Sequence, residues 1–197
     1  MRRFAVPFLL AAVLTGCSST EPGKPSAGEQ TGSAPTTGTS TKSSPVNRPK
    51  AVDMKTLDPC SLVTPEAKTA LGIRTVEPGA PDVDWGEGSK GCGTSYEDRK
   101  FIWSIDTVVN GGADRLKRTE GKETPLTEVK VAGYPAYLAK GTGGTRTPQC
   151  EIFVDSNDEQ LLRVAVTVAM GGDSTVDSAC ERATALAEAA GTVLATK

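Results

Sequence analysis

Five cysteines, one near the start of the chain and four in the rest of it, constrain this sequence more than any other feature. Cys17 ends the segment Leu14-Thr15-Gly16-Cys17, which lies behind two arginines and a short apolar run. This order is typical of an export signal with small residues at its cleavage site. The run of about ten residues is also too short to cross a bilayer. We therefore expect residues 1–16 to be a lipoprotein signal peptide and Cys17 to carry the lipid.

A lipidated Cys17 determines the expected location and the first partner of the protein. Two or more acyl chains anchor a protein stably in a membrane. The segment 18–50 has 22 Ser, Thr, Gly or Pro among its 33 residues and is too polar to bury a core. We expect residues 17–50 to form the lipidated cysteine and a disordered tether, and residues 51–197 to form one domain. The expected location is the extracytoplasmic face of the cell membrane.

The four remaining cysteines form an even set in a chain expected to be exported, where disulfides persist. Three pairings are possible. We prefer Cys60 with Cys92 and Cys150 with Cys180, because each bond would join a helix to a nearby strand. Zinc is the competing interpretation, but the domain has no Cys-x-x-Cys pair and the chain has no histidine. We expect neither a metal site nor a cofactor.

Local patterns predict an α+β fold. Thr64 and Pro65 are typical of a helix start and Gly72 of its end. An alanine-rich stripe follows Val176, with Ser174 and Asp177 as a capping box. Alternating apolar residues predict strands over 92–96, 101–109, 127–131, 136–139, 150–155 and 161–170. We expect an antiparallel sheet of five or six strands in a meander, with the N-terminal and the C-terminal helix on one face.

The order of these motifs resembles the DUF3558 family of actinobacterial lipoproteins. The resemblance rests on Leu57-Asp58-Pro59-Cys60-Ser61-Leu62-Val63-Thr64-Pro65-Glu66, Leu71-Gly72, Cys92, Val131-Ala132-Gly133-Tyr134-Pro135-Ala136, Cys150 and Ala179-Cys180. It implies an exported α+β domain with disulfides. The family has no established biochemical activity, so it provides no catalytic residues to compare.

Composition excludes several classes of function. Without histidine the chain cannot carry a Ser-His-Asp or Cys-His catalytic set. No Ser-x-x-Lys motif occurs in residues 51–197. Loss of residues 1–16 would change the formal net charge from −2 to −4, and a mildly acidic domain without a basic stripe argues against nucleic acid as a partner. We expect the protein not to be an enzyme.

Three loops contain groups that could bind ions. Asp82, Asp84 and Glu87 suggest calcium, but their spacing fails the EF-hand pattern, so we interpret them as a solvated turn. Calcium is also suggested by Asp155, Asn157 and Glu159. We interpret these three as residues of a hairpin turn between two apolar strands. The segment 141–146 could cradle an anion but fits no known phosphate-loop spacing, and we interpret it as a loop between strands.

The aromatic residues could line a groove. Trp103 alternates with Phe101 and Ile105, which favours a place in the core. Trp85 lies beside Gly86 in a polar loop, so we expect Trp85 to be exposed and to be the candidate binding residue.

These observations favour a noncatalytic domain that binds an unknown protein or small ligand at the cell surface. The alternative is an enzyme, or an enzyme accessory, that acts on cell-wall material through carboxylates. A carrier with an apolar cavity between the helices and the sheet is the third possibility. Two converging buried carboxylates in a cleft would favour the enzyme, whereas an aromatic-lined cavity would favour the carrier.

Overall fold

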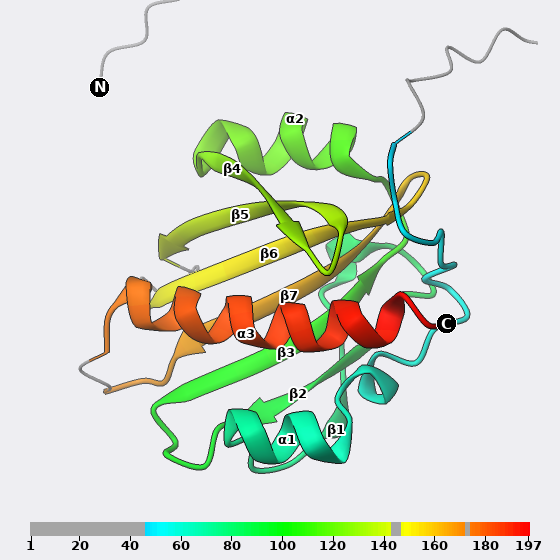
Figure 1. Cartoon of the computed structure of the whole chain (residues 1–197). Helices are drawn as coiled ribbons and strands as arrows, with labels where there is room; N and C mark the ends of the chain where they lie inside the picture. The colour runs from blue at the N-terminus through cyan, green and yellow to red at the C-terminus, as the bar shows by residue number, and fades with distance from the viewer. Residues whose placement is uncertain (1–45, 143–146, 172–173) are drawn as a thin grey trace, which may run out of the picture. The chain divides into compact units, whose positions relative to one another are not determined.

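A computed structural model describes residues 46–142, 147–171 and 174–197 (Figure 1). The expected signal peptide, Cys17 and most of the expected tether lie outside the described residues, as does most of the loop 141–146. The strands are β1 Glu77–Gly79, β2 Gly91–Ser95, β3 Phe101–Val108, β4 Leu126–Val131, β5 Tyr134–Thr142, β6 Pro148–Asn157 and β7 Gln160–Val168. The helices are α1 Pro65–Leu71, α2 Ala113–Glu123 and α3 Val176–Leu194, with 3-10 turns η1 Pro59–Leu62 and η2 Val83–Trp85.

The strands form one antiparallel sheet in the order β1-β2-β3-β7-β6-β5-β4. Neighbours in sequence are neighbours in space within β1–β3 and within β4–β7, and β3 pairs with β7 in the middle. The sheet has seven strands instead of the expected five or six. The additional strand is β1, whose residues Glu77-Pro78-Gly79 are exposed and lack the apolar alternation that marked the other six.

The two expected helices are present, with one shift in a cap. Thr64 caps α1 through a hydrogen bond from the Ala67 N–H, and Gly72 ends it at a φ of 63°. The capping box of α3 is formed by Thr175 and Ser178 rather than by Ser174 and Asp177. The expected box was wrong by one residue because a Ser or Thr stands at several neighbouring positions and any of them can act as the first cap.

The third helix, α2, was not expected and lies on the other face of the sheet. Its Leu116 packs with Tyr137, Phe153 and Leu161. In β6 the side chain of Phe153 points opposite to those of Ile152 and Val154, which belong to the core beneath α3. The helices are therefore not confined to one face: α3 and α1 lie together on one, and α2 covers part of the other (Figure 1).

Small residues let α3 lie close to the sheet. Ala179, Ala183, Ala187 and Ala190 are fully buried on its inner side. At Gly191 an added Cβ would lie 2.9 Å from Val131 Cγ1, so a side chain there would push the helix off the β4–β5 turn. The alanine-rich stripe predicted this close approach.

Packed structure begins before Ala51. Arg48 Nη2 lies 2.8 Å from Asp155 Oδ1, and Arg48 also pairs with Asp158. The end of the segment that we expected to be tether is therefore held on the β6–β7 hairpin, because its arginine satisfies a buried carboxylate there.

Candidate functional site

A charged cluster lies on the sheet face that points away from α3, and Arg163 of β7 is at its centre. Arg163 Nη1 donates to Asp106 Oδ2 of β3 at 2.6 Å, and Arg163 Nε donates to Glu151 Oε1 of β6 at 2.7 Å. Ser104 Oγ donates to Asp106 Oδ2 at 2.9 Å. Asp106 and Arg163 are direct partners in the β3–β7 register, so strand pairing itself brings this ion pair together.

Burial shapes the electrostatics of this cluster. The side chains of Asp106 and Arg163 are only 6% and 14% exposed. Burial raises the pKa of Asp106 above 3.8, and the nearby Arg163 and Ser104 offset this only in part. Burial also opposes the charge of Arg163, but the carboxylates of Glu151 and Asp106 outweigh it and raise the pKa of the guanidinium. The cluster therefore holds a guanidinium whose charge two carboxylates balance.

Trp85 covers this cluster instead of facing solvent, so the expectation that it is exposed was wrong. Trp85 is 9% exposed, and its ring lies 5.5 Å from Arg163 Cζ and 6.2 Å from the ring of Phe153. The turn η2 folds onto the sheet because the Val109 N–H donates to the Trp85 carbonyl oxygen at 3.0 Å. The Arg163 guanidinium and the Phe153 ring together hold the indole ring of Trp85, through a cation–π contact and an edge contact between the two rings.

The acidic loop around η2 uses one carboxylate and one carbonyl oxygen within the fold. Asp82 Oδ1 accepts from the Asp84 N–H at 3.0 Å and caps η2. The Asp84 carbonyl oxygen accepts from Asn110 and Arg115 side chains. Among the described residues, no group of three potential metal-binding side chains comes together.

Part of the same sheet face remains accessible beside the cluster. We call it the open shelf; its side chains come from β2, β3, β6 and β7 and are Ser95, Ile102, Ser104, Gln149, Glu151 and Thr167. Ile102 is 48% exposed, which is unusual for an isoleucine within a central strand. Thr167 Oγ1 donates to Gln149 Oε1 at 3.3 Å. The open shelf combines an exposed apolar side chain with hydroxyl and amide groups that can hydrogen-bond to a partner.

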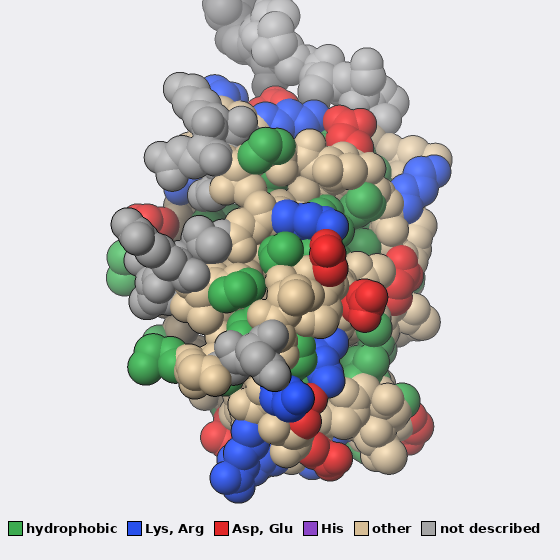
Figure 2. Space-filling view, turned by 90° about the vertical axis from the view of Figure 1, so that its left-hand side faces the viewer, with side chains coloured by type: hydrophobic (Ala, Val, Ile, Leu, Met, Phe, Trp, Pro, Cys, Tyr) green, Lys and Arg blue, Asp and Glu red, His purple; other side chains and the backbone are tan. Residues whose placement is uncertain are grey.

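Charges near this end of the sheet are mixed in sign. Figure 2 shows the molecule from the side where β5 and β7 end, and basic and acidic side chains there lie next to one another. Hydrophobic side chains are scattered among them. Such a surface does not favour a polyanion as a partner.

A separate pocket of about 370 Å³ lies between the N-terminal segment of the domain and the end of α3. None of the described residues that line it is aromatic. The lining residues are Lys50, Ala51, Val52, Asp53, Thr56, Leu57, Asp58, Ser61 and Lys197. Its mixed polar and apolar lining differs from the mainly apolar cavity that a carrier of apolar ligands would need.

The aromatic residues that could have lined a groove are in the interior. Trp103 is buried beneath α3, as expected. Tyr96 is buried, and this burial raises its pKa to about 12. Arg182 of α3 lies 4.6 Å from the ring of Tyr96 and pairs with Asp98 at 2.6 Å, which joins the helix to the β2–β3 turn.

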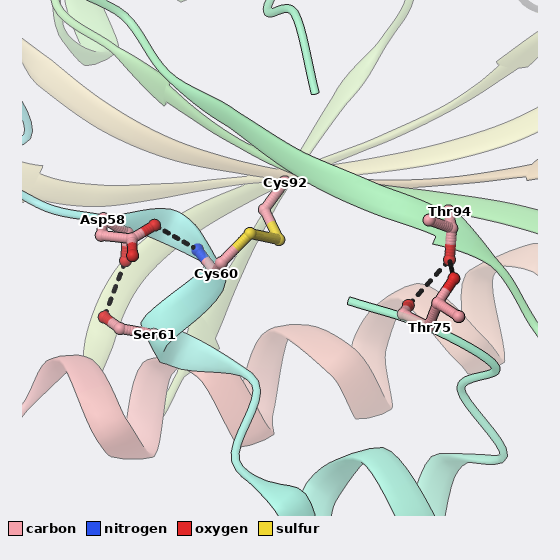
Figure 3. Close-up of a disulfide and its surroundings, with 6 residues drawn as sticks. All are labelled: Asp58, Cys60, Ser61, Thr75, Cys92 and Thr94. Carbon is pink, nitrogen blue, oxygen red and sulfur yellow. Dashed lines mark hydrogen bonds between the residues drawn. A yellow bond between two sulfur atoms is a disulfide. The ribbon is translucent and has the colours of Figure 1, made fainter. Parts of the chain in front are cut away.

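Two disulfides lie on the face of the sheet that α3 covers. Their pairing is the one that we preferred from the sequence. Cys60 and Cys92 join η1 to β2 (Figure 3), and Cys150 and Cys180 join β6 to α3. Asp58 Oδ1 accepts from the Cys60 N–H at 3.0 Å, so the turn that carries Cys60 is itself fixed. On the other side of Cys92 in Figure 3, the Thr94 hydroxyl donates to the Thr75 carbonyl oxygen at 2.7 Å.

The profile of a family described as "Protein of unknown function (DUF3558)" matches residues 12–192. The chain belongs to the DUF3558 family. No curated protein and no solved structure matches this DUF3558 chain significantly. In the described part of the chain no helix is both long and apolar enough to span a membrane.

The charged cluster was missed in the sequence although two signals for it were present. Arg163 interrupts the apolar run Leu161 to Val168, and Asp106 interrupts the run Phe101 to Val108. A charged residue inside each of two predicted strands indicates either an edge position or a buried pair. Arg163 and Asp106 form a pair because β3 lies beside β7, and this strand order cannot be read from the sequence.

The raised pKa of Asp106 gives a testable pH dependence. The folded state binds this proton more tightly than the unfolded state, so the stabilising contribution is complete below pH 3.8 and is lost as pH rises through the raised pKa. Asp106→Asn removes this titration. We expect the difference in unfolding free energy, wild type minus variant, to be largest at low pH and to shrink as pH rises.

Urea unfolding at several values from about pH 3 to pH 7 measures this difference. Asp114→Asn on the exposed side of α2 is the matched control for the loss of a carboxylate. A difference for Asp106→Asn that grows with rising pH would contradict the assignment.

Proposed function

We propose that this DUF3558 protein is a lipid-anchored, noncatalytic binding domain at the extracytoplasmic face of the cell membrane. The segment Leu14-Thr15-Gly16-Cys17 supports the anchor and the export route. The two disulfides support an oxidising compartment, because structural disulfides are rare in the cytosol. A domain of this kind acts beside a membrane.

We infer a noncatalytic role because the buried carboxylates are already paired with arginines. Asp106 and Glu151 both bind Arg163, and Asp155 binds Arg48. A general acid or base must reach its substrate within hydrogen-bond distance. Asp106 is almost fully buried beneath its partners, so its role is to hold the sheet together.

The open shelf is the proposed contact surface. Its Ile102 lies near the start of β3, and burying the exposed half of this side chain on a partner would contribute about 1 kcal/mol. The neighbouring hydroxyl and amide groups of Thr167 and Gln149 can provide direction through hydrogen bonds. Because strands carry all of these groups, the surface is rigid before binding.

Replacement of Cys17 by serine tests the anchor. Serine has no thiol for a thioether-linked lipid, so we expect Cys17→Ser to lose all incorporation of labelled fatty acid and to leave the membrane fraction. Fatty-acid labelling and fractionation of cells that express the full chain measure both effects. Retention in the membrane with unchanged labelling would show that Cys17 is not the lipidation site.

A photoreactive amino acid at position 102 in intact cells tests the contact surface. The matched control is the same amino acid at Ala185, which is exposed on the outer side of α3. We expect a discrete crosslinked adduct from position 102 and none from position 185. The same adducts from both positions, or none from either, would contradict the open shelf as the contact surface.

The carboxylate-dependent enzyme remains the second candidate, because Asp106 and Glu151 converge on one arginine and the pKa of Asp106 is raised. The binding domain and the enzyme predict different results when Asp106 and Glu151 are replaced by neutral amides. With the photoreactive group at position 102, Asp106→Asn combined with Glu151→Gln should lower the melting temperature and the yield of adduct together if the cluster is structural, because Arg163 then loses both of its carboxylates. An adduct that accumulates only in this variant would instead indicate a trapped substrate.

A further inference from the structure

The outer edge of β4 has hydrogen-bonding groups with no partner in the described part of the chain. Among the described strands, β4 is the last of the sheet and pairs with β5 alone. Ala132 and Gly133 have φ angles of 46° and 87° and form a two-residue hairpin turn. Such a turn makes Val131 and Tyr134 a hydrogen-bonded pair, and the bonding then alternates along the strand. Leu126, Glu128 and Lys130 therefore direct their N–H and C=O groups outward.

The two charged side chains of this edge are far from buried. Glu128 is 78% exposed and has Lys117 as its ion-pair partner at 3.5 Å, which is a weak surface contact. Lys130 is exposed as well. Exposed charges often prevent strand addition at an edge, because most partners offer no matching charge.

A second copy of β4 does offer a match. In a two-fold antiparallel pair centred on Val129, Glu128 lies opposite Lys130 of the other copy, and the reverse pair is equivalent by symmetry. In this register Glu128 and Lys130 of the two copies form hydrogen-bonded pairs, which agrees with the outward direction of their backbone N–H and C=O groups. A register centred on Glu128 would instead oppose two glutamates.

We propose that the β4 edge is a self-association surface, at which two copies of the chain pair antiparallel about Val129 and join their sheets. The contact is one six-residue strand per copy, so it is at the small end of protein interfaces and the dimer is weak. It uses the β4 edge of the sheet, whereas the open shelf lies on a face of the sheet, and it does not depend on the lipid.

Cysteine crosslinking of the purified full chain tests this register at the resolution of one residue. Residues at the centre of the pair lie about 4.5 Å apart between Cα atoms, within the range that a disulfide spans. The Thr127 residues of the two copies lie about 13 Å apart in this register, beyond that range. We expect Val129→Cys, and not the control Thr127→Cys, to form a covalent dimer on mild oxidation.

Charge reversal tests the partner. Glu128→Lys places lysine opposite lysine in both symmetry-related pairs and should reduce the crosslinked fraction of the Val129→Cys protein roughly tenfold. The added change Lys130→Glu restores opposite charges and should restore the crosslink. Unchanged melting temperatures show that the variants are folded.

Equal crosslinking of the Val129→Cys and Thr127→Cys proteins would overturn the proposal, because it indicates random collision. A Val129→Cys protein that stays monomeric would overturn it as well, whether the edge is free or is covered by a segment of the same chain. Failure of the charge swap to restore the crosslink would contradict the proposed register.

Discussion

Arg163→Met is expected to lower the unfolding free energy by about 3–5 kcal/mol, because it leaves two carboxylates without their cation on a buried sheet face. Asp106 bears most of this cost, since its side chain is almost fully buried. The cost should be smaller below the raised pKa of Asp106, where the protonated carboxyl needs no cation. Chemical denaturation at neutral and acidic pH measures both quantities.

Arg182→Met is the matched control for this prediction. Arg182 is more exposed, and it pairs with Asp98 and stacks on Tyr96 and Phe101. Its loss should cost less than about 2 kcal/mol. Adding Asp106→Leu and Glu151→Met to Arg163→Met should recover much of the stability, because the penalty comes from unpaired charge. A cost for Arg163→Met no larger than that for Arg182→Met would contradict the structural role of the cluster.

Removal of the Cys150–Cys180 disulfide by substitution of both residues with alanine is the second large effect. The bond closes a loop of 30 residues, and the chain-entropy model assigns such a loop roughly 3.5–4 kcal/mol. For a domain of this size we expect the melting temperature to fall by roughly 10 °C. Thermal unfolding of the purified full chain, with and without the two substitutions, measures the change.

The Cys60–Cys92 disulfide provides the comparison. It closes a loop of similar length, with a sequence separation of 32, so chain entropy alone predicts an equal loss. Cys150 is fully buried, whereas Cys60 is only partly buried. Packing should therefore make the loss of Cys150–Cys180 the larger of the two. A negligible effect from both double substitutions would show that the disulfides do not stabilise the domain.

The parts of the fold that the sequence predicted depend on local patterns. Phe101, Trp103 and Ile105 alternate with less buried positions, and this alternation identified β3 and its buried face. The Thr64-Pro65 cap and Gly72 defined α1 for the same reason, because a few adjacent residues determine helix ends. The disulfide pairing was predicted correctly, but its reason held only for Cys150–Cys180, which joins a predicted strand to a predicted helix. Cys60 lies in the 3-10 turn η1 ahead of the expected helix, and this turn was not predicted.

The elements that were missed have weak local patterns. In α2, Leu116 is the only large apolar residue in the first turns, so no helical stripe could be seen. In β1, Pro78 and Gly79 disfavour a strand, and pairing with β2 overrides that preference at the edge of the sheet.

The candidate site depends on contacts between strands that are distant in sequence. Asp106 and Arg163 meet because β3 lies beside β7, and that order is set by the path of the chain through α2 to the far edge of the sheet. Trp85 was misjudged for the same reason. Its polar neighbours suggested exposure, while the arginine and phenylalanine that bury it belong to two other strands.

The intact mass of the nonreduced protein isolated from membranes tests the lipid anchor and the two disulfides most directly. We expect a chain that begins at Cys17, carries the added mass of the lipid, and is lighter by four hydrogens than its reduced form because of the two disulfides. A chain that retains residues 1–16 without lipid, or that contains four free thiols in the domain, would contradict this expectation.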